Sequence, residues 1–139
     1  MADHPARMIS MVSRKCTQTL DKEGWLAMFA EDGKIEDPIG ISYLDETGEG
    51  HSTPEARELF WDKNIANSDI TITIHHSYAC GDEVANNITI DMEFDMDGKP
   101  HSQQINGIFT YCLNQEGKLA SMRGYWELDA AMKTIKPLR

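Results

Sequence analysis

The chain has 139 residues, three cysteines and a formal net charge of −10. This length suits one domain, so we treat residues 1–139 as a single domain. The negative charge disfavours nucleic acid or an anionic membrane as partner and favours a neutral, apolar ligand. An odd number of cysteines without a Cys-x-x-Cys pair argues against a disulfide framework or a zinc knuckle. The sequence shows neither a secretory leader nor a membrane-spanning apolar run, so we expect a soluble, cytoplasmic protein.

The first half of the chain predicts three helices, a short strand and a loop. Apolar residues recur at helical spacing through the first segment, which indicates an amphipathic helix. Thr53-Pro54-Glu55 combines a capping residue, a proline at the first helical position and an acid in the first turn, so a helix begins there. The expected helices span residues 8–20, 24–30 and 53–66, with a strand over residues 34–37 and a loop over residues 41–50.

The second half of the chain predicts a sheet. After Ser68 the apolar residues recur at every second position, and on this alternation His76 shares the apolar face of its strand. Asp97-Gly98 and Gln115-Glu116-Gly117 are hairpin signals. Helices followed by a run of antiparallel strands indicate an α+β fold in which the sheet wraps around the helices. The expected strands span residues 70–78, 88–96, 105–113 and 119–128.

Asp37 is the main candidate for a catalytic residue. It stands at the end of the short strand, directly before Pro38. A residue before proline is driven out of helical conformation, and the proline ends the strand, so we expect the Asp37 side chain at a chain reversal. An Asp-Pro pair alone is more often a turn than a catalytic site. The surrounding residues therefore decide its interpretation.

The run from Phe29 to Gly40, Phe-Ala-Glu-Asp-Gly-Lys-Ile-Glu-Asp-Pro-Ile-Gly, resembles the base-carrying segment of the ketosteroid isomerases. Two further matches, at residues 56–61 and 117–126, follow in the family's order. Elsewhere the resemblance supports the wider SnoaL-like and nuclear transport factor 2-like superfamily. It implies a cystatin-like cone, in which a curved mixed or antiparallel sheet wraps around three N-terminal helices and encloses an apolar pocket.

By this resemblance Asp37 is the general base of a steroid Δ5-isomerase-like enzyme. It would take a proton from the carbon between the carbonyl and the double bond, and return it two carbons further along the dienolate. The resemblance implies no metal and no organic cofactor. It implies an apolar, steroid-like ligand as partner, and a homodimer formed through the outer face of the sheet.

The hydrogen-bond donors that the family uses to stabilise the enolate are absent at the aligned positions. Typical members place a Tyr on the first helix and a protonated Asp on the third strand. The matching residues here are Cys16, a poor donor, and Phe109, which donates nothing. Asn106 could turn inward if the strand bulges at Gly107. The sequence therefore leaves Phe109 and Asn106 open at that position.

The remaining wall of the pocket is expected to come from apolar and aromatic side chains. His75 and His76 are neighbours on a strand and point to opposite faces, so His76 is interpreted as pocket lining rather than as a metal ligand. Met92 and Phe94 would form an adaptable wall for a flat ligand. The expected substrate-binding residues are Cys16, Phe60, Trp61, His76, Met92, Phe94, Asn106, Phe109, Tyr111, Met122 and Trp126.

Two other functions stay open. The missing donors favour a protein that binds a steroid or another lipophilic molecule without converting it. A polyketide cyclase or an epoxide hydrolase of the same superfamily would use Asp37 to deprotonate a carbon or to activate water. Epoxide hydrolases of this shape need an Asp-Arg-Asp network. Arg123 has the opposite parity to Met122 and Gly124 on its strand, and is expected to face away from the pocket.

Overall fold

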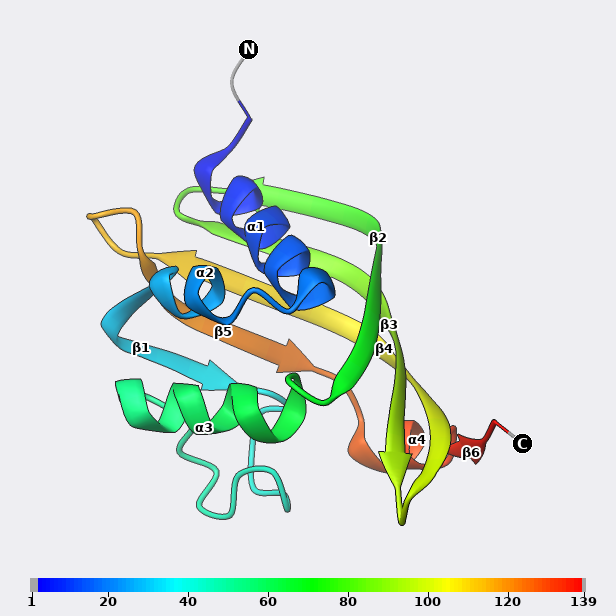
Figure 1. Ribbon diagram of the computed structural model, residues 1–139. Helices are drawn as coiled ribbons and strands as arrows, with labels where there is room; N and C mark the ends of the chain where they lie inside the picture. The colour runs from blue at the N-terminus through cyan, green and yellow to red at the C-terminus, as the bar shows by residue number, and fades with distance from the viewer. Residues whose placement is uncertain (1–2, 139) are drawn as a thin grey trace.

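The computed structural model describes residues 3–138 (Figure 1). None of the helices within this range combines the length and the apolar character needed to cross a bilayer. The elements in chain order are α1 (Pro5–Thr19), α2 (Lys22–Ala27), β1 (Phe29–Glu36), α3 (Pro54–Asn64), β2 (Ser68–Cys80), β3 (Glu83–Met96), β4 (Lys99–Leu113), β5 (Leu119–Tyr125), α4 (Leu128–Met132) and β6 (Lys136–Pro137).

The strands form one mixed sheet in the order β1-β5-β4-β3-β2, and β6 pairs with β4. The β1–β5 pair is parallel and the other pairs are antiparallel. Figure 1 shows the long strands β2, β3 and β4 bending strongly, with α1, α2 and α3 on the inside of the curve. This arrangement confirms the predicted α+β fold, with a curved mixed sheet around three N-terminal helices.

The local signals in the sequence produce the expected geometry. The Thr53 side chain accepts a hydrogen bond of 3.1 Å from the Ala56 backbone amide, which caps α3. Asp97 and Gly98 have φ angles of 54° and 76°, the pair of positive values that a two-residue hairpin turn requires. The hairpin therefore keeps β3 and β4 paired as far as Met96 and Lys99.

The last part of the chain differs from the prediction. The strand expected over residues 119–128 ends at Tyr125, and the chain continues into α4 and β6. Neither of these two elements was predicted. With five and two residues, they are too short to produce a recognisable hydrophobic period.

An irregularity in β2 makes the predicted alternation wrong at His76. Ile74 pairs with Ile88 of β3, whereas His76 pairs with Asn87, so the chain accommodates one extra residue, His75. Residues that face each other across paired strands lie on the same side of a sheet. His76 therefore leaves the inner face of Ile74 and Ile88 and lies exposed on the outer face.

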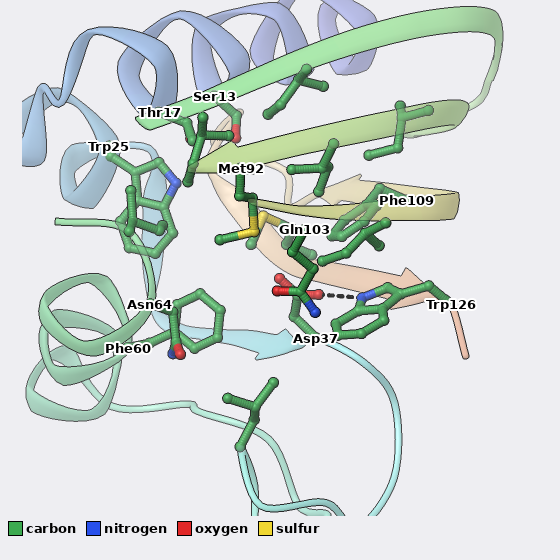
Figure 2. Close-up of a pocket in the computed structure, with 18 of the residues that line it drawn as sticks. Ser13, Thr17, Trp25, Asp37, Phe60, Asn64, Met92, Gln103, Phe109 and Trp126 are labelled. Atoms are coloured by element: carbon green, nitrogen blue, oxygen red, sulfur yellow. Dashed lines mark hydrogen bonds between the residues drawn. The ribbon is translucent and has the colours of Figure 1, made fainter. Parts of the chain in front are cut away.

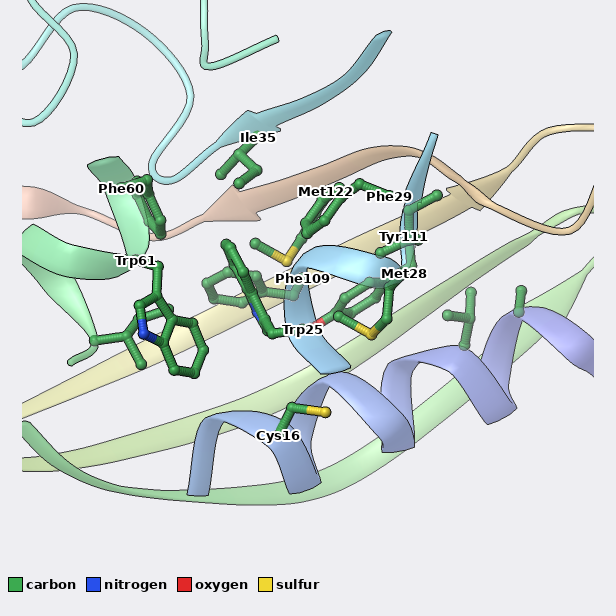
Figure 3. Packing of buried hydrophobic residues seen from close by; sticks show 14 of the residues in the cluster. Cys16, Trp25, Met28, Phe29, Ile35, Phe60, Trp61, Phe109, Tyr111 and Met122 are labelled. Atoms are coloured by element: carbon green, nitrogen blue, oxygen red, sulfur yellow. The ribbon is translucent and has the colours of Figure 1, made fainter. Parts of the chain in front are cut away.

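The core lies between the three N-terminal helices and the sheet (Figure 3). Trp25 of α2 stands at its centre, with ring-centre distances of 5.0 Å to Phe29, 6.3 Å to Phe60 and 5.1 Å to Trp61. Large aromatic side chains bury much apolar surface, so this cluster anchors α2 and α3 to the start of β1.

Trp61 is only 2% exposed, and its replacement tests this packing. We expect Trp61→Ala to lower the free energy of unfolding by about 3–5 kcal/mol, because it removes a large buried side chain and leaves a cavity. Urea denaturation followed by circular dichroism measures the loss. Leu59→Ala, at an exposed position on the same helix, is the matched control and should change stability by about 0.5 kcal/mol or less. Equal losses in the two variants would contradict the core position of Trp61.

Candidate functional site

An apolar cavity of about 150 Å³ lies between the inner face of the sheet and helices α1, α2 and α3 (Figure 2). Isoleucines from β2, β3 and β4 form much of its wall. Tyr43, from the loop after β1, lines the cavity and is 65% exposed, so it marks the mouth. Ser13, Trp25 and Tyr111 are buried and mark the interior.

The end of β1 directs Asp37 into this cavity. Glu36, the preceding residue, lies on the other side of the sheet, where its carboxylate accepts a hydrogen bond of 3.1 Å from Arg123 Nε. The chain after Asp37 is fixed to β5, because the Ile39 backbone amide donates to the Gly124 carbonyl oxygen at 3.1 Å. Alternation along the strand and this backbone contact together point the Asp37 side chain inward.

Asp37 is held by one short hydrogen bond. Trp126 Nε1 donates to Asp37 Oδ1 at 2.6 Å, as the dashed line in Figure 2 shows. Between residues 3 and 138, no group donates a hydrogen bond to the second carboxyl oxygen, Oδ2. Asp37 is also the only acidic side chain among the described residues that line the cavity. The hydrogen bond to Oδ1 thus fixes the orientation of the carboxyl group, and Oδ2 remains available to a ligand.

The surroundings of Asp37 change its acidity. Burial raises the pKa of Asp37 from 3.8 to about 6, and the hydrogen bond from Trp126 opposes this rise because it stabilises the charged form. A carboxyl group with a pKa of about 6 can both accept and return a proton near neutral pH. Proton transfer is therefore the chemistry that this site can perform.

Two glycines leave room for the contact between Asp37 and Trp126. A Cβ atom at Gly124 would lie 2.9 Å from both Asp37 Oδ1 and Trp126 Nε1, and 3.0 Å from Phe109 Cε2. A Cβ atom at Gly107 would collide with the Tyr125 carbonyl oxygen and the Trp126 Cβ atom. Any side chain at either position would displace Trp126 or the carboxyl group.

The register of β4 decides which residues of the third long strand face the cavity. The β3–β4 pairing is continuous through Gly107, without a bulge, so Phe109 lies inside and Asn106 lies outside. Asn106 is exposed and accepts a hydrogen bond of 2.6 Å from Thr89 Oγ1. The sequence-predicted residues that the structure brings to the cavity are Asp37, Phe60, Met92, Phe109, Tyr111, Met122 and Trp126.

Five residues expected in the cavity lie elsewhere: His76 and Asn106 on the outer face, and Cys16, Trp61 and Phe94. Cys16 faces α2, with Sγ 3.9 Å from Asp21 Oδ2, and burial raises the pKa of its thiol. Trp61 packs against Trp25 in the core. Phe94 lies near the hairpin tip, half-buried, and stacks on His101.

Several polar residues of the cavity were not predicted from the sequence. Ser13 and Thr17 line it from α1, one turn apart, where Cys16 was expected. Asn64 comes from the last turn of α3, and Gln103 comes from β4. The four-residue spacing of Ser13 and Thr17 was the available signal, because it places both hydroxyl groups on one face of the helix.

The comparisons with known proteins agree with this architecture. The profile of the SnoaL-like domain family matches residues 12–122. The chain belongs to this family. No curated protein matches the sequence significantly.

Several solved structures are similar to this SnoaL-like chain over almost their full length. RV0760c from Mycobacterium tuberculosis is 34% identical, with 99% of this chain and 98% of that chain covered and a TM-score of 0.85. It has also been solved in complex with estradiol-17β-hemisuccinate. A Δ5-3-ketosteroid isomerase from Mycobacterium sp. is 29% identical (97% and 99% covered, TM-score 0.85). A computationally designed 17-OHP binder is 35% identical (97% and 99% covered, TM-score 0.86).

The buried carboxyl group should destabilise the folded chain above its pKa. Between pH ~4 and pH ~6, Asp37 is mostly ionised in the unfolded chain but still mostly protonated in the folded chain. The free energy of unfolding of the wild type therefore falls as the pH rises through this range. This loss reaches about 3 kcal/mol over about two pH units. Asp37→Asn cannot ionise, so it should gain about that much relative to wild type between pH ~4 and pH ~7.5.

Urea denaturation at both pH values measures this gain. Asp69→Asn, which removes an exposed carboxylate from the outer face of β2, is the control. If the stability difference between Asp37→Asn and wild type were the same at both pH values, the pKa assigned to Asp37 would be wrong.

Proposed function

We propose that the chain binds a steroid or a similarly flat unsaturated ketone and isomerises it, with Asp37 as the proton-transferring base. The observation that carries this proposal is the Asp37 carboxyl group, half-buried at the wall of an apolar cavity and held by the Trp126 indole at 2.6 Å. The pKa of about 6 suits a base that must also return its proton.

The reaction proceeds in two proton transfers. The Asp37 carboxylate takes a proton from the carbon between the carbonyl group and the isolated double bond. The C–H electron pair enters the conjugated system, and negative charge develops on the ketone oxygen of the dienolate. The protonated Asp37 then delivers the same proton to the far carbon of the former double bond. The product is the conjugated ketone, and the carboxylate is restored.

The walls of the cavity and the similar proteins support a steroid-like ligand. Ile88, Ile90 and Met92 of β3 and Phe109 of β4 offer apolar surface to a flat, neutral skeleton. One similar structure contains estradiol-17β-hemisuccinate, another is a designed 17-OHP binder, and a third is a Δ5-3-ketosteroid isomerase.

We also propose that the outer face of the sheet pairs two copies of the chain. Tyr78, Ile108 and Tyr125 are 68%, 43% and 47% exposed. Tyr78 and Ile108 lie on the face opposite the cavity, because their cross-strand partners Ala85 and Asn87 alternate with the inward residues. Burying such apolar side chains between two copies would stabilise a homodimer.

The second candidate is a steroid-binding protein that performs no chemistry. One observation favours it: Phe109 fills the position where relatives carry an acidic donor, and α1 brings no tyrosine to the cavity. An epoxide hydrolase or polyketide cyclase has less support. The Arg123 side chain pairs with Glu36 on the outer face, so it forms no Asp-Arg-Asp network with Asp37.

An ultraviolet assay with a Δ5-3-ketosteroid tests the proposed function, because the conjugated product absorbs where the substrate does not. We expect wild type to form the product and Asp37→Asn to be slower by a factor of about 10² to 10⁴. The wild-type kcat/KM should rise with pH through about 6 and then level off, since the carboxylate is the active form. Asp69→Asn should match wild type.

Two results would contradict the proposal in different ways. A folded wild type that quenches its tryptophan fluorescence on adding the steroid, but converts none of it, would identify a binding protein. A folded wild type that neither converts nor binds the steroid would exclude both candidates.

A further inference from the structure

The cavity has a polar end. Ser13 and Thr17 of α1, Trp25 of α2 and Tyr111 of β4 line it, and each carries a polar hydrogen. Figure 2 shows Ser13, Thr17 and the Trp25 indole on the same side of the cavity, away from Trp126. Tyr111, which is buried on the inward face of β4, lines the same cavity. The rest of the wall is mainly aliphatic and aromatic carbon.

The other donors of the cavity are partly engaged or less deeply buried. The Trp126 N–H donates to Asp37, and one of the two N–H groups of the Gln103 amide donates to the Ala131 carbonyl oxygen at 3.3 Å. Gln103 and Asn64 are only half-buried. Trp61 lies in the core, outside the cavity. A ligand oxygen that enters the interior therefore meets the polar end as its source of hydrogen bonds.

Tyr111 is the member of the polar end that is best placed to act together with Asp37. It follows Phe109 by two residues on the inward face of β4 and pairs with Met122 of β5. Burial raises the pKa of Tyr111 to about 12, the nearby Ser13 hydroxyl opposes this rise, and the charge of Asp37 adds to it. The phenol therefore keeps its proton at neutral pH, and it lies within the electrostatic reach of the base.

The phenol proton of Tyr111 is available for a ligand. Ser13 lies near enough to the phenol to oppose the rise in its pKa. Between residues 3 and 138, no group accepts a short hydrogen bond from the Tyr111 O–H, and both side chains line the cavity. The Tyr111 O–H can therefore donate into the cavity.

We propose that the Tyr111 hydroxyl donates the hydrogen bond that binds and polarises the ligand's ketone oxygen, and that Ser13 is its positioning residue. This inference rests on the proposed function and supplies its missing donor. In typical ketosteroid isomerases a tyrosine on the first helix donates this hydrogen bond. Here a tyrosine on β4, next to a serine on α1, would donate it. No proton leaves Tyr111, and the negative charge of the dienolate stays on the ligand oxygen.

The assignment also orients the ligand. Its ketone oxygen lies at the polar end, its reacting carbons lie beside Asp37, and its opposite end lies toward the mouth. Asn64 and Gln103 are half-buried side chains of the wall that could meet a second polar group there. The chemical class that fits is a flat lipophilic ketone with oxygen atoms at both ends of a rigid skeleton.

Tyr111→Phe removes only the hydroxyl group and keeps the ring that packs in the wall. The probe is 4-androstene-3,17-dione, whose enone absorption moves to longer wavelength when its C3 oxygen accepts a strong hydrogen bond. We expect this shift with wild type and its loss with Tyr111→Phe at saturating protein. With the Δ5-3-ketosteroid, kcat should fall about 10²- to 10³-fold while KM changes far less, since the donor acts mainly on the developing charge.

Two further variants sharpen the test. Tyr78→Phe, which loses a phenol hydroxyl on the outer face but keeps the ring proposed to contact a second copy, should match wild type in absorption and rate. Ser13→Ala should reduce the absorption shift and kcat by less than Tyr111→Phe does, because it acts through the phenol.

The outcomes separate the donor assignment from the proposed function. If Tyr111→Phe binds the probe with the full wild-type shift and the same kcat, the donor assignment is wrong and the isomerase proposal survives. If wild type shows the shift without isomerising the Δ5-3-ketosteroid, and Tyr111→Phe loses it, the donor assignment stands and the isomerase proposal fails. A wild type that binds neither steroid overturns both.

Discussion

The hydrogen bond from the Trp126 indole to the Asp37 carboxylate is the contact on which the account of this site depends. A buried carboxylate is costly unless donors compensate for the water it has lost. Here a single N–H at 2.6 Å compensates in part, and burial still leaves the pKa of Asp37 at about 6. More donors would lower the pKa and make the carboxylate a weaker base, and fewer would raise the pKa further. One donor therefore gives a base that is matched to neutral conditions.

The pairing of β1 with β5 brings the two residues of this contact together. Asp37 and Trp126 are 89 residues apart in the sequence and meet because β1 lies parallel to β5. The ion pair between Glu36 and Arg123 fixes the same two strands from the outer face. Gly124 supplies the space in which the carboxyl group and the indole approach each other. The helices close the other side, so the base, the polar end and the apolar wall share one cavity.

Much of this arrangement could be predicted from the sequence, and the failures have local causes. Asp37 could be found because Pro38 fixes its backbone. The sequence left the choice between Phe109 and Asn106 open, and the continuous β3–β4 register decides it for Phe109. His76 was misplaced because one extra residue in β2 reverses the alternation, and no composition signal marks such an irregularity. Cys16 was expected in the cavity because it aligns with the family's tyrosine, but an alignment does not fix the rotation of a helix about its axis, and Ser13 and Thr17 line the cavity instead. The core position of Trp61 depends on tertiary packing with α2, which the local pattern does not contain.

Direct titration of the Asp37 carboxyl carbon by ¹³C nuclear magnetic resonance tests the central claim most closely. Asp37→Asn identifies the resonance by its disappearance. We expect a pKa of about 6 in wild type and a higher value in Trp126→Phe, because that variant loses the donor but keeps an aromatic ring in the wall. A wild-type pKa near 3.8, the ordinary value for Asp, would contradict the burial of the carboxyl group. An unchanged pKa in Trp126→Phe would contradict the role given to the indole.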